Sequence, residues 1–436
     1  MTAEIAIMNK EALALAADSA VTMIGESRRK IFTSANKLFA LSKYHPVGIM
    51  VYGNAIFMDV PWETIIKIYR KNLGKKKFDT LKKYANDFIA FLDNGNPLFP
   101  YSTQEKYLRN SIYAYFDLIK GNIIEKVHKK TDEKGKITKE EINQLISEII
   151  KRHYLIWEKE DNIPSIPKSY NKNLVIKYGK IINKAIEEIF EKLPISKNHS
   201  NQLKKIASNL FSKFPEKFQK ENISGVVIAG FGEKNTFPSL KSFYIEGIAN
   251  NKLKCIYIKD KSAEIDFTVS ACIIPFAQSE MVATFMEGID PYLQVTIESY
   301  LSKIFDKYPE IIAENVAKND NNEKKRHLLQ KKLKEVSNKI FADYQNGVQS
   351  YRRKNYVEPV IRVVSMLPKD ELAAMAESLV NLTSFKRKVT MESETVGGPI
   401  DVAVISKGDG FIWIKRKHYF KAELNPQFFA NYYKEV

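Results

Sequence analysis

Residues 2–19 read TAEIAIMNKEALALAADS, and this stretch decides how the rest of the chain is interpreted. Its two strand-like runs, 4–8, which is apolar after Glu4, and 12–17, flank Asn9-Lys10-Glu11, a pattern typical of a β-hairpin. The second run is apolar at every position, which indicates a strand buried on both faces. An acidic residue, Asp18, follows that run directly.

The second residue of the chain, Thr2, is a candidate nucleophile. Its side chain is small enough to permit removal of Met1, and the new N-terminus would carry a hydroxyl and a free amine on one residue. An α-amine with a pKa of about 7.7 to 8.0 can accept the hydroxyl proton near neutral pH. Thr2 would then supply both the nucleophile and its base.

The composition is that of a folded protein. Of 436 residues, 44% are hydrophobic and 27% are charged, which excludes a disordered chain. Two cysteines, Cys255 and Cys272, cannot form a disulfide-rich scaffold or a cysteine-based zinc site. The six histidines lack ligand spacing, so no metal and no cofactor is expected.

The charge and hydropathy patterns limit the kinds of partner and the location that the sequence is compatible with. We expect a cytoplasmic protein without a membrane segment, because no signal-like segment and no apolar run of about 18 residues occurs. The net charge of +17 makes nucleic acid or an acidic surface a plausible neighbour. Since no nucleic-acid-binding motif accompanies it, nucleic acid is a possible partner that the sequence does not favour.

The remaining chain alternates between strand-like and helix-like blocks. Residues 61–222 are helical in pattern and basic, with about 32 Lys plus Arg against 20 Asp plus Glu. The charged segment 319–334 is expected to be solvated helix or loop. Further strands are expected at 37–41, 47–52, 224–231, 241–245, 254–258, 265–272, 400–406 and 411–415, and helices near 79–92, 104–130, 139–160, 172–192, 199–220, 292–352 and 369–386.

Several of these motifs resemble those of proteasome β-subunits, the N-terminal threonine branch of the N-terminal nucleophile hydrolases. Asp18 follows Thr2 at the spacing of that family's aspartate. The runs Val226-Val227-Ile228-Ala229-Gly230-Phe231 and Gly397-Gly398-Pro399-Ile400 resemble the family's central hairpin and the glycine pair after its last helix. The resemblance covers residues 2–60, about 223–288 and about 368–416.

The resemblance implies an α+β fold, a four-layer αββα sandwich with large all-helical insertions. The sandwich would comprise residues 1–60, 223–290 and 368–436, with a basic helical insertion at 61–222 and a second one at 291–367. It also implies a homo-oligomer, a peptide or unfolded protein as substrate, and an ATP-dependent unfoldase as a possible partner.

The same resemblance implies roles for individual residues. Thr2 would be the nucleophile, Lys37 and Asp18 would tune its amine, and the backbone N–H of Gly53 would form the oxyanion hole. Lys30 is a rival for the lysine, and Lys37 is preferred because the order strand, turn, strand, glycine runs from Lys37 to Gly53.

The sequence also departs from that family. Ser393 and Val396 stand where the family has an aspartate and a serine beside the amine, and Ser393 could still hydrogen-bond the amine without bringing a charge. The segment 276–279 replaces a Gly-Ser-Gly-Ser loop. These departures weaken the surroundings of the nucleophile.

An apolar substrate pocket is expected from four residues near the first specificity pocket of the family. The four are Val21, Phe39, Val51 and Ala55. Ordinary core packing explains such side chains equally well.

The leading hypothesis is a threonine peptidase that cleaves peptide bonds with Thr2. Two alternatives remain open: a catalytically inactive scaffold that binds partners, and a hydrolase of small amides with the same nucleophile. Each site residue also has an ordinary structural explanation, since Asp18 could cap a strand end, Lys37 could be a solvated edge residue and Gly53 could serve a turn.

Overall fold

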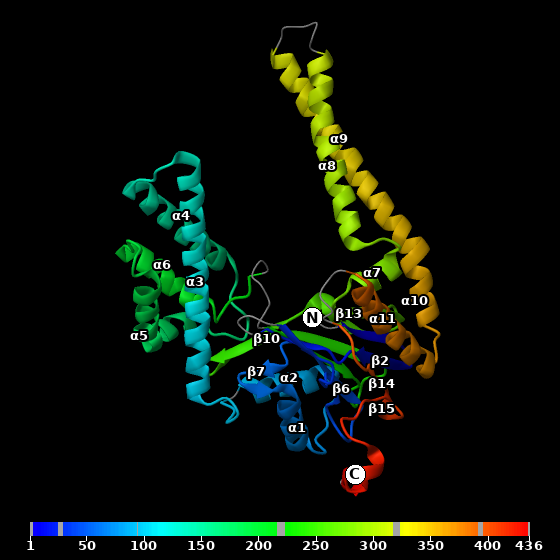
Figure 1. Ribbon diagram of the computed structural model, residues 1–436. Coiled ribbons are helices and arrows are strands. Elements are labelled where there is room, and N and C mark those ends of the chain that lie inside the picture. The colour runs from blue at the N-terminus through cyan, green and yellow to red at the C-terminus, as the bar shows by residue number, and fades with distance from the viewer. Residues whose placement is uncertain are drawn as a thin grey trace. The chain divides into compact units, whose positions relative to one another are not determined.

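The structure is a computed structural model that describes residues 3–24, 29–93, 95–215, 223–316, 323–390 and 396–434. Its helices and antiparallel sheets confirm the expectation of a mixed α and β fold (Figure 1). The chain forms two compact units. The first comprises Met1–Leu38, Thr236–Ser239 and Ala263–Val436, and the second comprises Phe39–Asn235 and Leu240–Ser262.

The first unit contains a five-stranded antiparallel sheet in the order β13-β1-β2-β14-β15. The two N-terminal strands therefore lie between strands from the second half of the chain. The strands are β1 (Ala3–Asn9), β2 (Ala12–Ala17), β13 (Ala271–Ala277), β14 (Asp401–Ser406) and β15 (Gly410–Lys415), and the short strands β3 (Val21–Ile24), β4 (Arg29–Phe32) and β12 (Ala263–Glu264) also belong to this unit.

The β1–β2 hairpin turns at Asn9. The Oδ1 atom of Asn9 accepts the backbone N–H groups of Glu11 at 2.9 Å and of Ala12 at 3.1 Å, which closes the turn without a glycine. Every residue of β1 and β2 is buried. Both faces of the sheet are therefore covered at this hairpin.

Helix α11 (Lys369–Val389) covers one of those faces. Its Leu372, Ala376 and Leu379 recur at helical spacing and pack in one cluster with Ile5 and Ala14. The other helices of this unit are α7 (Glu280–Glu287), α8 (Pro291–Val316), α9 (Glu323–Arg352), α10 (Glu358–Val364) and α12 (Pro426–Lys434), with a π-helical stretch at Arg353–Val357.

The second unit contains the other large sheet, in the order β11-β10-β9-β6-β5. Val226, Ile228 and Ile49 from this sheet pack in one cluster with Ile65 and Phe88 from helices α1 and α2. The elements are β5 (Leu38–Ala40), β6 (Val47–Gly53), β7 (Ile56–Phe57), β8 (Val60–Pro61), α1 (Trp62–Leu73), α2 (Leu81–Asp93), β9 (Ser224–Gly230), β10 (Ser239–Ala249) and β11 (Lys252–Tyr257).

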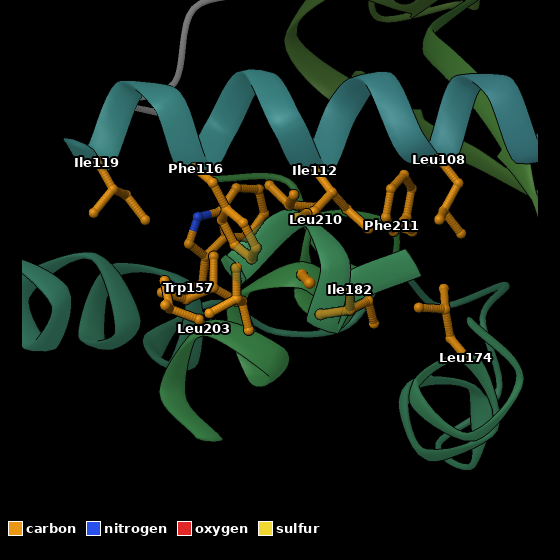
Figure 2. Close-up of a cluster of buried hydrophobic side chains, with 14 of the residues drawn as sticks. Leu108, Ile112, Phe116, Ile119, Trp157, Leu174, Ile182, Leu203, Leu210 and Phe211 are labelled. Carbon is orange, nitrogen blue, oxygen red and sulfur yellow. The ribbon is translucent and has the colours of Figure 1, made fainter. Parts of the chain in front are cut away.

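A helical bundle completes the second unit. It consists of α3 (Tyr101–Lys134), α4 (Lys139–Lys159), α5 (Tyr170–Phe190) and α6 (Lys197–Asn209). Long apolar side chains recur every three or four residues along α3, so they share one side of the helix. Figure 2 shows this side of α3 facing side chains of the other helices and of the turn after α6, with Leu108, Ile112, Phe116 and Ile119 opposite Trp157, Ile182, Leu203 and Phe211.

Most of the expected elements are present, with shifted ends. The expected strand at 265–272 is wrong, because β13 begins at Ala271. Asp266 Oδ1 accepts the N–H groups of Thr268 and Val269, both at 2.7 Å, and this turn occupies the positions before the strand. The expected helix at 199–220 ends at Asn209. The sequence pattern does not indicate β3, β4, β7 and β8, which are at most four residues long.

The expected division into a core at 1–60, 223–290 and 368–436 with insertions at 61–222 and 291–367 stays a prediction. The two compact units divide the chain at other points, and they group α1–α6 with the second sheet. The four-layer stacking of the sandwich also stays a prediction. Among the helices of the described residues, none combines the length and apolar character that crossing a bilayer requires.

Replacing Ile112 by alanine tests the core of the helical bundle. Ile112 is fully buried, so Ile112→Ala should lower the free energy of unfolding by about 2–5 kcal/mol through lost burial and a residual cavity. Urea denaturation of the full chain, followed by far-UV circular dichroism, measures this change.

Ile176 provides the matched control, because it lies in α5 and is 71% exposed. Ile176→Ala should leave the unfolding curve almost unchanged. Equal effects of the two substitutions would contradict the position of the bundle core.

Candidate active site

Asp18 lies directly after β2, and its carboxylate is enclosed by the protein. Its side chain has no exposed surface. Within the described residues, three backbone N–H groups donate to it: Ala3 to Oδ1 at 3.0 Å, Ala20 to Oδ2 at 3.1 Å and Gly397 to Oδ2 at 3.0 Å. Asp18 also donates its own N–H to the carbonyl of Ala3 at 3.1 Å. The carboxylate thus joins the ends of β1 and β2 to the segment that precedes β14.

Lys37 forms an ion pair with this carboxylate. Its Nζ donates to Asp18 Oδ1 at 2.6 Å, and the lysine side chain is only 7% exposed. A buried ammonium group is costly unless a charged partner and hydrogen bonds compensate it. The ion pair is therefore part of the buried structure of the first unit. Lys37 is not the solvated edge residue that its ordinary structural explanation would make it.

The structure brings this pair next to the residue that follows Thr2. Ala3 is bonded to Thr2 in the chain, and its N–H donates to the same Oδ1 atom that accepts Lys37 Nζ. Thr2 itself and Ser393 lie outside the described residues, so their predicted roles stay predictions. Lys30 lies in β4, and its side chain is outside the described part of the structure. The positions of the Lys30 and Lys37 side chains therefore cannot be compared, and the preference for Lys37 stays a prediction.

Gly53, the predicted oxyanion donor, belongs to the second unit and ends β6. Its φ is +81°, in the left-handed region, and a Cβ atom at this position would lie 2.4 Å from the carbonyl oxygen of Ile223. Glycine is therefore required here by backbone conformation and by space. This requirement explains the residue without a catalytic role and leaves its predicted role as a prediction.

The four residues of the predicted substrate pocket have different surroundings. Val21 is partly exposed and lies in β3 of the first unit. Phe39 and Val51 are buried in the cluster that joins the second sheet to α1 and α2, and Ala55 is exposed. The contacts of Phe39 and Val51 are those of core residues, and the pocket stays a prediction.

Two acidic residues that pair with Ala17, the neighbour of Asp18, are not among the predicted site residues. Glu4 in β1 is 1% exposed and lies opposite Ala17, the neighbour of Asp18. A glutamate within an otherwise apolar strand is a signal that could have pointed to it. Asp401 lies on the other side of Ala17 and forms a partly buried ion pair with Lys417, which no sequence spacing indicates.

The loop after β13 also meets the start of β1. Ala277 pairs with Ala3 across the sheet and has a φ of +56°, a conformation that costs energy for alanine. The next residue, Gln278, is buried and accepts a hydrogen bond from Arg387 Nε at 2.9 Å. Strained backbone conformations of this kind are often found at functional sites. The strain at Ala277 is therefore consistent with a functional role for the segment opposite Ala3.

Comparisons with known proteins give little support to a family assignment. No protein-family model matches the chain, and no curated protein matches it. A solved structure, Anbu (ancestral beta-subunit) from Yersinia bercovieri, is similar with a TM-score of 0.27 and 9% sequence identity, over 99% of this chain and 94% of that chain. A likeness of this strength does not establish a common fold.

The assignment to the proteasome β-subunit family is therefore wrong. It rests on short motifs, and no family model supports it. The geometry around Asp18 and Lys37 does not depend on that assignment. In the described part of the chain, no three His, Cys, Asp or Glu side chains gather as metal ligands would.

Removing the carboxylate of Asp18 tests the buried ion pair. Asp18→Ala should lower the free energy of unfolding by about 3–5 kcal/mol, because it deprives a buried ammonium group of its counter-charge. Lys37→Met should cost less, because the carboxylate keeps its three N–H donors. Urea denaturation of the full chain measures both.

The exposed pair Lys67–Glu63 on α1 is the control for these two variants. Glu63→Ala should change the unfolding curve very little, because exposed ion pairs contribute little to stability. If Asp18→Ala were as harmless as Glu63→Ala, the ion pair would not be buried in solution.

Replacing Gly53 by alanine tests the backbone at the end of β6. Gly53→Ala should cost about 1–2 kcal/mol from the left-handed conformation alone, and more from the close carbonyl of Ile223. Gly408→Ala in the β14–β15 turn is the control, since no atom lies within 4 Å of its Cβ position. Thermal unfolding compares them, and equal stability would contradict the described conformation of Gly53.

Proposed function

We propose that this protein is a hydrolase in which Thr2, made N-terminal by removal of Met1, attacks the carbonyl carbon of a peptide bond. The observation that carries the proposal is the buried Lys37–Asp18 pair, whose Oδ1 atom also accepts the N–H of Ala3. A compensated ammonium group then shares a carboxylate oxygen with Ala3, which is bonded to Thr2, the residue that would serve as nucleophile and base.

The charge of Lys37 is what makes the proposed chemistry work at neutral pH. A cation near the Thr2 amine disfavours the protonated form of that amine and lowers its pKa, so the amine is free to accept the hydroxyl proton. Asp18 compensates the positive charge of Lys37, and its Oδ1 atom lies 2.6 Å from Lys37 Nζ. This ion pair keeps the cation in place within the protein. The hydroxyl oxygen then attacks the carbonyl carbon, the peptide C–N bond breaks as the amine passes its proton to the leaving nitrogen, and an ester remains. Water then hydrolyses the ester, which releases the carboxylic acid and restores the Thr2 hydroxyl.

The oxyanion of this reaction needs a hydrogen-bond donor, and we assign that role to the N–H of Gly53. A glycine permits close approach of backbone to substrate, and a backbone N–H stabilises negative charge as it develops. Ser393 would assist the Thr2 amine. Val21, Phe39, Val51 and Ala55 would favour an apolar residue before the cut.

The proposed substrate is a peptide or an unfolded protein, and an ATP-dependent unfoldase is a possible supplier. The proposal keeps the four-layer αββα arrangement as its fold, and the burial of every residue in β1 and β2 supports covered sheet faces. A hydrolase of small amides would use the same nucleophile. A peptide library compared with a panel of small acyl amides separates these two substrates.

The state of the N-terminus provides the first test. We expect intact mass and N-terminal sequencing of the protein purified from its natural cells to show Thr2 as the first residue. A peptide β-lactone or boronate should then form an adduct with Thr2, and Thr2→Ala should form none. Lys37→Met should lower kcat/KM on peptide substrates by at least about a hundredfold, since proton transfer supplies this much.

The matched control is Lys67→Met, which removes an exposed lysine from α1 and should leave labelling and hydrolysis unchanged. Retention of Met1 in natural protein, together with no Thr2-dependent adduct, would overturn the proposal. That result would favour a catalytically inactive scaffold that binds partners through its basic helices.

A further inference from the structure

Helices α8 and α9 form an antiparallel hairpin within the first unit and lie side by side (Figure 1). Gln345 Nε2 donates to Glu298 Oε2 at 3.1 Å, and Ser337 Oγ donates to the carbonyl of Phe305 at 2.6 Å. The Phe305 ring also contacts the Phe341 ring, with centroids 5.4 Å apart. These contacts define the seam, which runs through 294, 298 and 305 on α8 and through 337, 341, 345 and 352 on α9.

Exposed apolar side chains line a second face of the same hairpin. Each of them precedes a seam residue by one position, or lies one or two helical turns from such a position. Ile304 and Ile340, near the middle, are 57% and 52% exposed. We call this set the apolar face: Leu293, Ile297, Tyr300, Ile304, Tyr308 and Ile311 on α8, and Val336, Ile340, Tyr344 and Tyr351 on α9.

Helix geometry places the two rows on one side of the hairpin. One residue step turns a side chain by about 100° around its helix axis. In an antiparallel pair, the same step from the seam turns the side chains of both helices toward the same side. The ten side chains therefore form one continuous stripe, and an aligned stripe of this kind marks an interaction surface.

The two helices differ in charge. Helix α8 carries four acidic and two basic side chains, a net charge of −2, whereas α9 carries eight basic and three acidic side chains, a net charge of +5. The apolar face is thus formed by one helix of net negative charge and one of net positive charge. Such a surface is complementary to a rotated copy of itself.

We propose that the apolar face binds a second copy of this chain, and that the two hairpins form a four-helix bundle. The two-fold axis lies parallel to the hairpin, so α8 of one copy packs beside α9 of the other. At both contacts, α8 with its net charge of −2 faces α9 with its net charge of +5. A two-fold axis across the hairpin would set α9 against α9, with like charges facing each other.

Sedimentation equilibrium of the full chain tests the dimer. We expect wild type to dimerise, and the double substitution Ile304→Gln with Ile340→Gln to raise the dimer Kd by about a hundredfold, because four isoleucines leave each interface. Both side chains are exposed in the single chain, so folding is preserved. Ile176→Gln, on an exposed position of α5, is the control and should not change the Kd.

Disulfide cross-linking tests the orientation. The contact between Phe305 and Phe341 puts positions 304 and 340 at similar heights along the hairpin. A mixture of an Ile304→Cys chain and a differently tagged Ile340→Cys chain should form a mixed disulfide on mild oxidation, and neither chain should cross-link alone. Burial raises the pKa of Cys255 and of Cys272 to about 12, so the native thiols react slowly.

Three results would overturn the proposal. One is a wild-type chain that stays monomeric at tens of micromolar, and another is a double variant that dimerises as tightly as wild type. The third is flotation of wild type, but not of the double variant, with phosphatidylserine vesicles while the protein remains monomeric, which would identify a membrane as the occupant. None of these results depends on the chemistry at Thr2.

Discussion

The structure around the N-terminus depends on the burial of one carboxylate. Asp18 can lose its water because protein donors replace it, among them the N–H groups of Ala3, Ala20 and Gly397 and the ammonium group of Lys37. Each of these donors belongs to a different stretch of the first unit, so satisfying the carboxylate fixes several segments at once. A structural constraint and a candidate catalytic feature therefore coincide in one side chain, and an exposed ion pair could provide neither.

The fold is predictable from sequence where local pattern and burial agree. The β1–β2 hairpin follows from two apolar runs and an Asn turn, and helices such as α11 follow from the spacing of Leu372, Ala376 and Leu379. Prediction fails where side-chain bonds override apolar pattern, as when Asp266 ends the expected strand at 265–272 and moves it to 271–277. Strands of two to four residues carry too few side chains for any periodicity.

The candidate site is only partly accessible to sequence reasoning. The residues around Lys37 in the sequence do not indicate that its side chain is buried. Asp18 is suggested by its spacing from Thr2, and nothing in the sequence indicates that it contacts Lys37. The family assignment was wrong because short apolar strands with a nearby glycine or aspartate recur among unrelated proteins. Gly397 contributes through its backbone N–H, which no residue type reveals. Glu4 was accessible in principle, since an acid in a strand of buried apolar residues requires an explanation.

The donation from Gly397 to Asp18 also orders events during translation. These residues are 379 positions apart, and β14, the neighbour of β2 in the sheet, begins at Asp401. Before the ribosome reaches Gly397, the β1–β2 hairpin lacks β14 as the neighbour of β2, and Asp18 lacks the N–H donor of Gly397. The hairpin therefore acquires these contacts only after several hundred further residues have been synthesised.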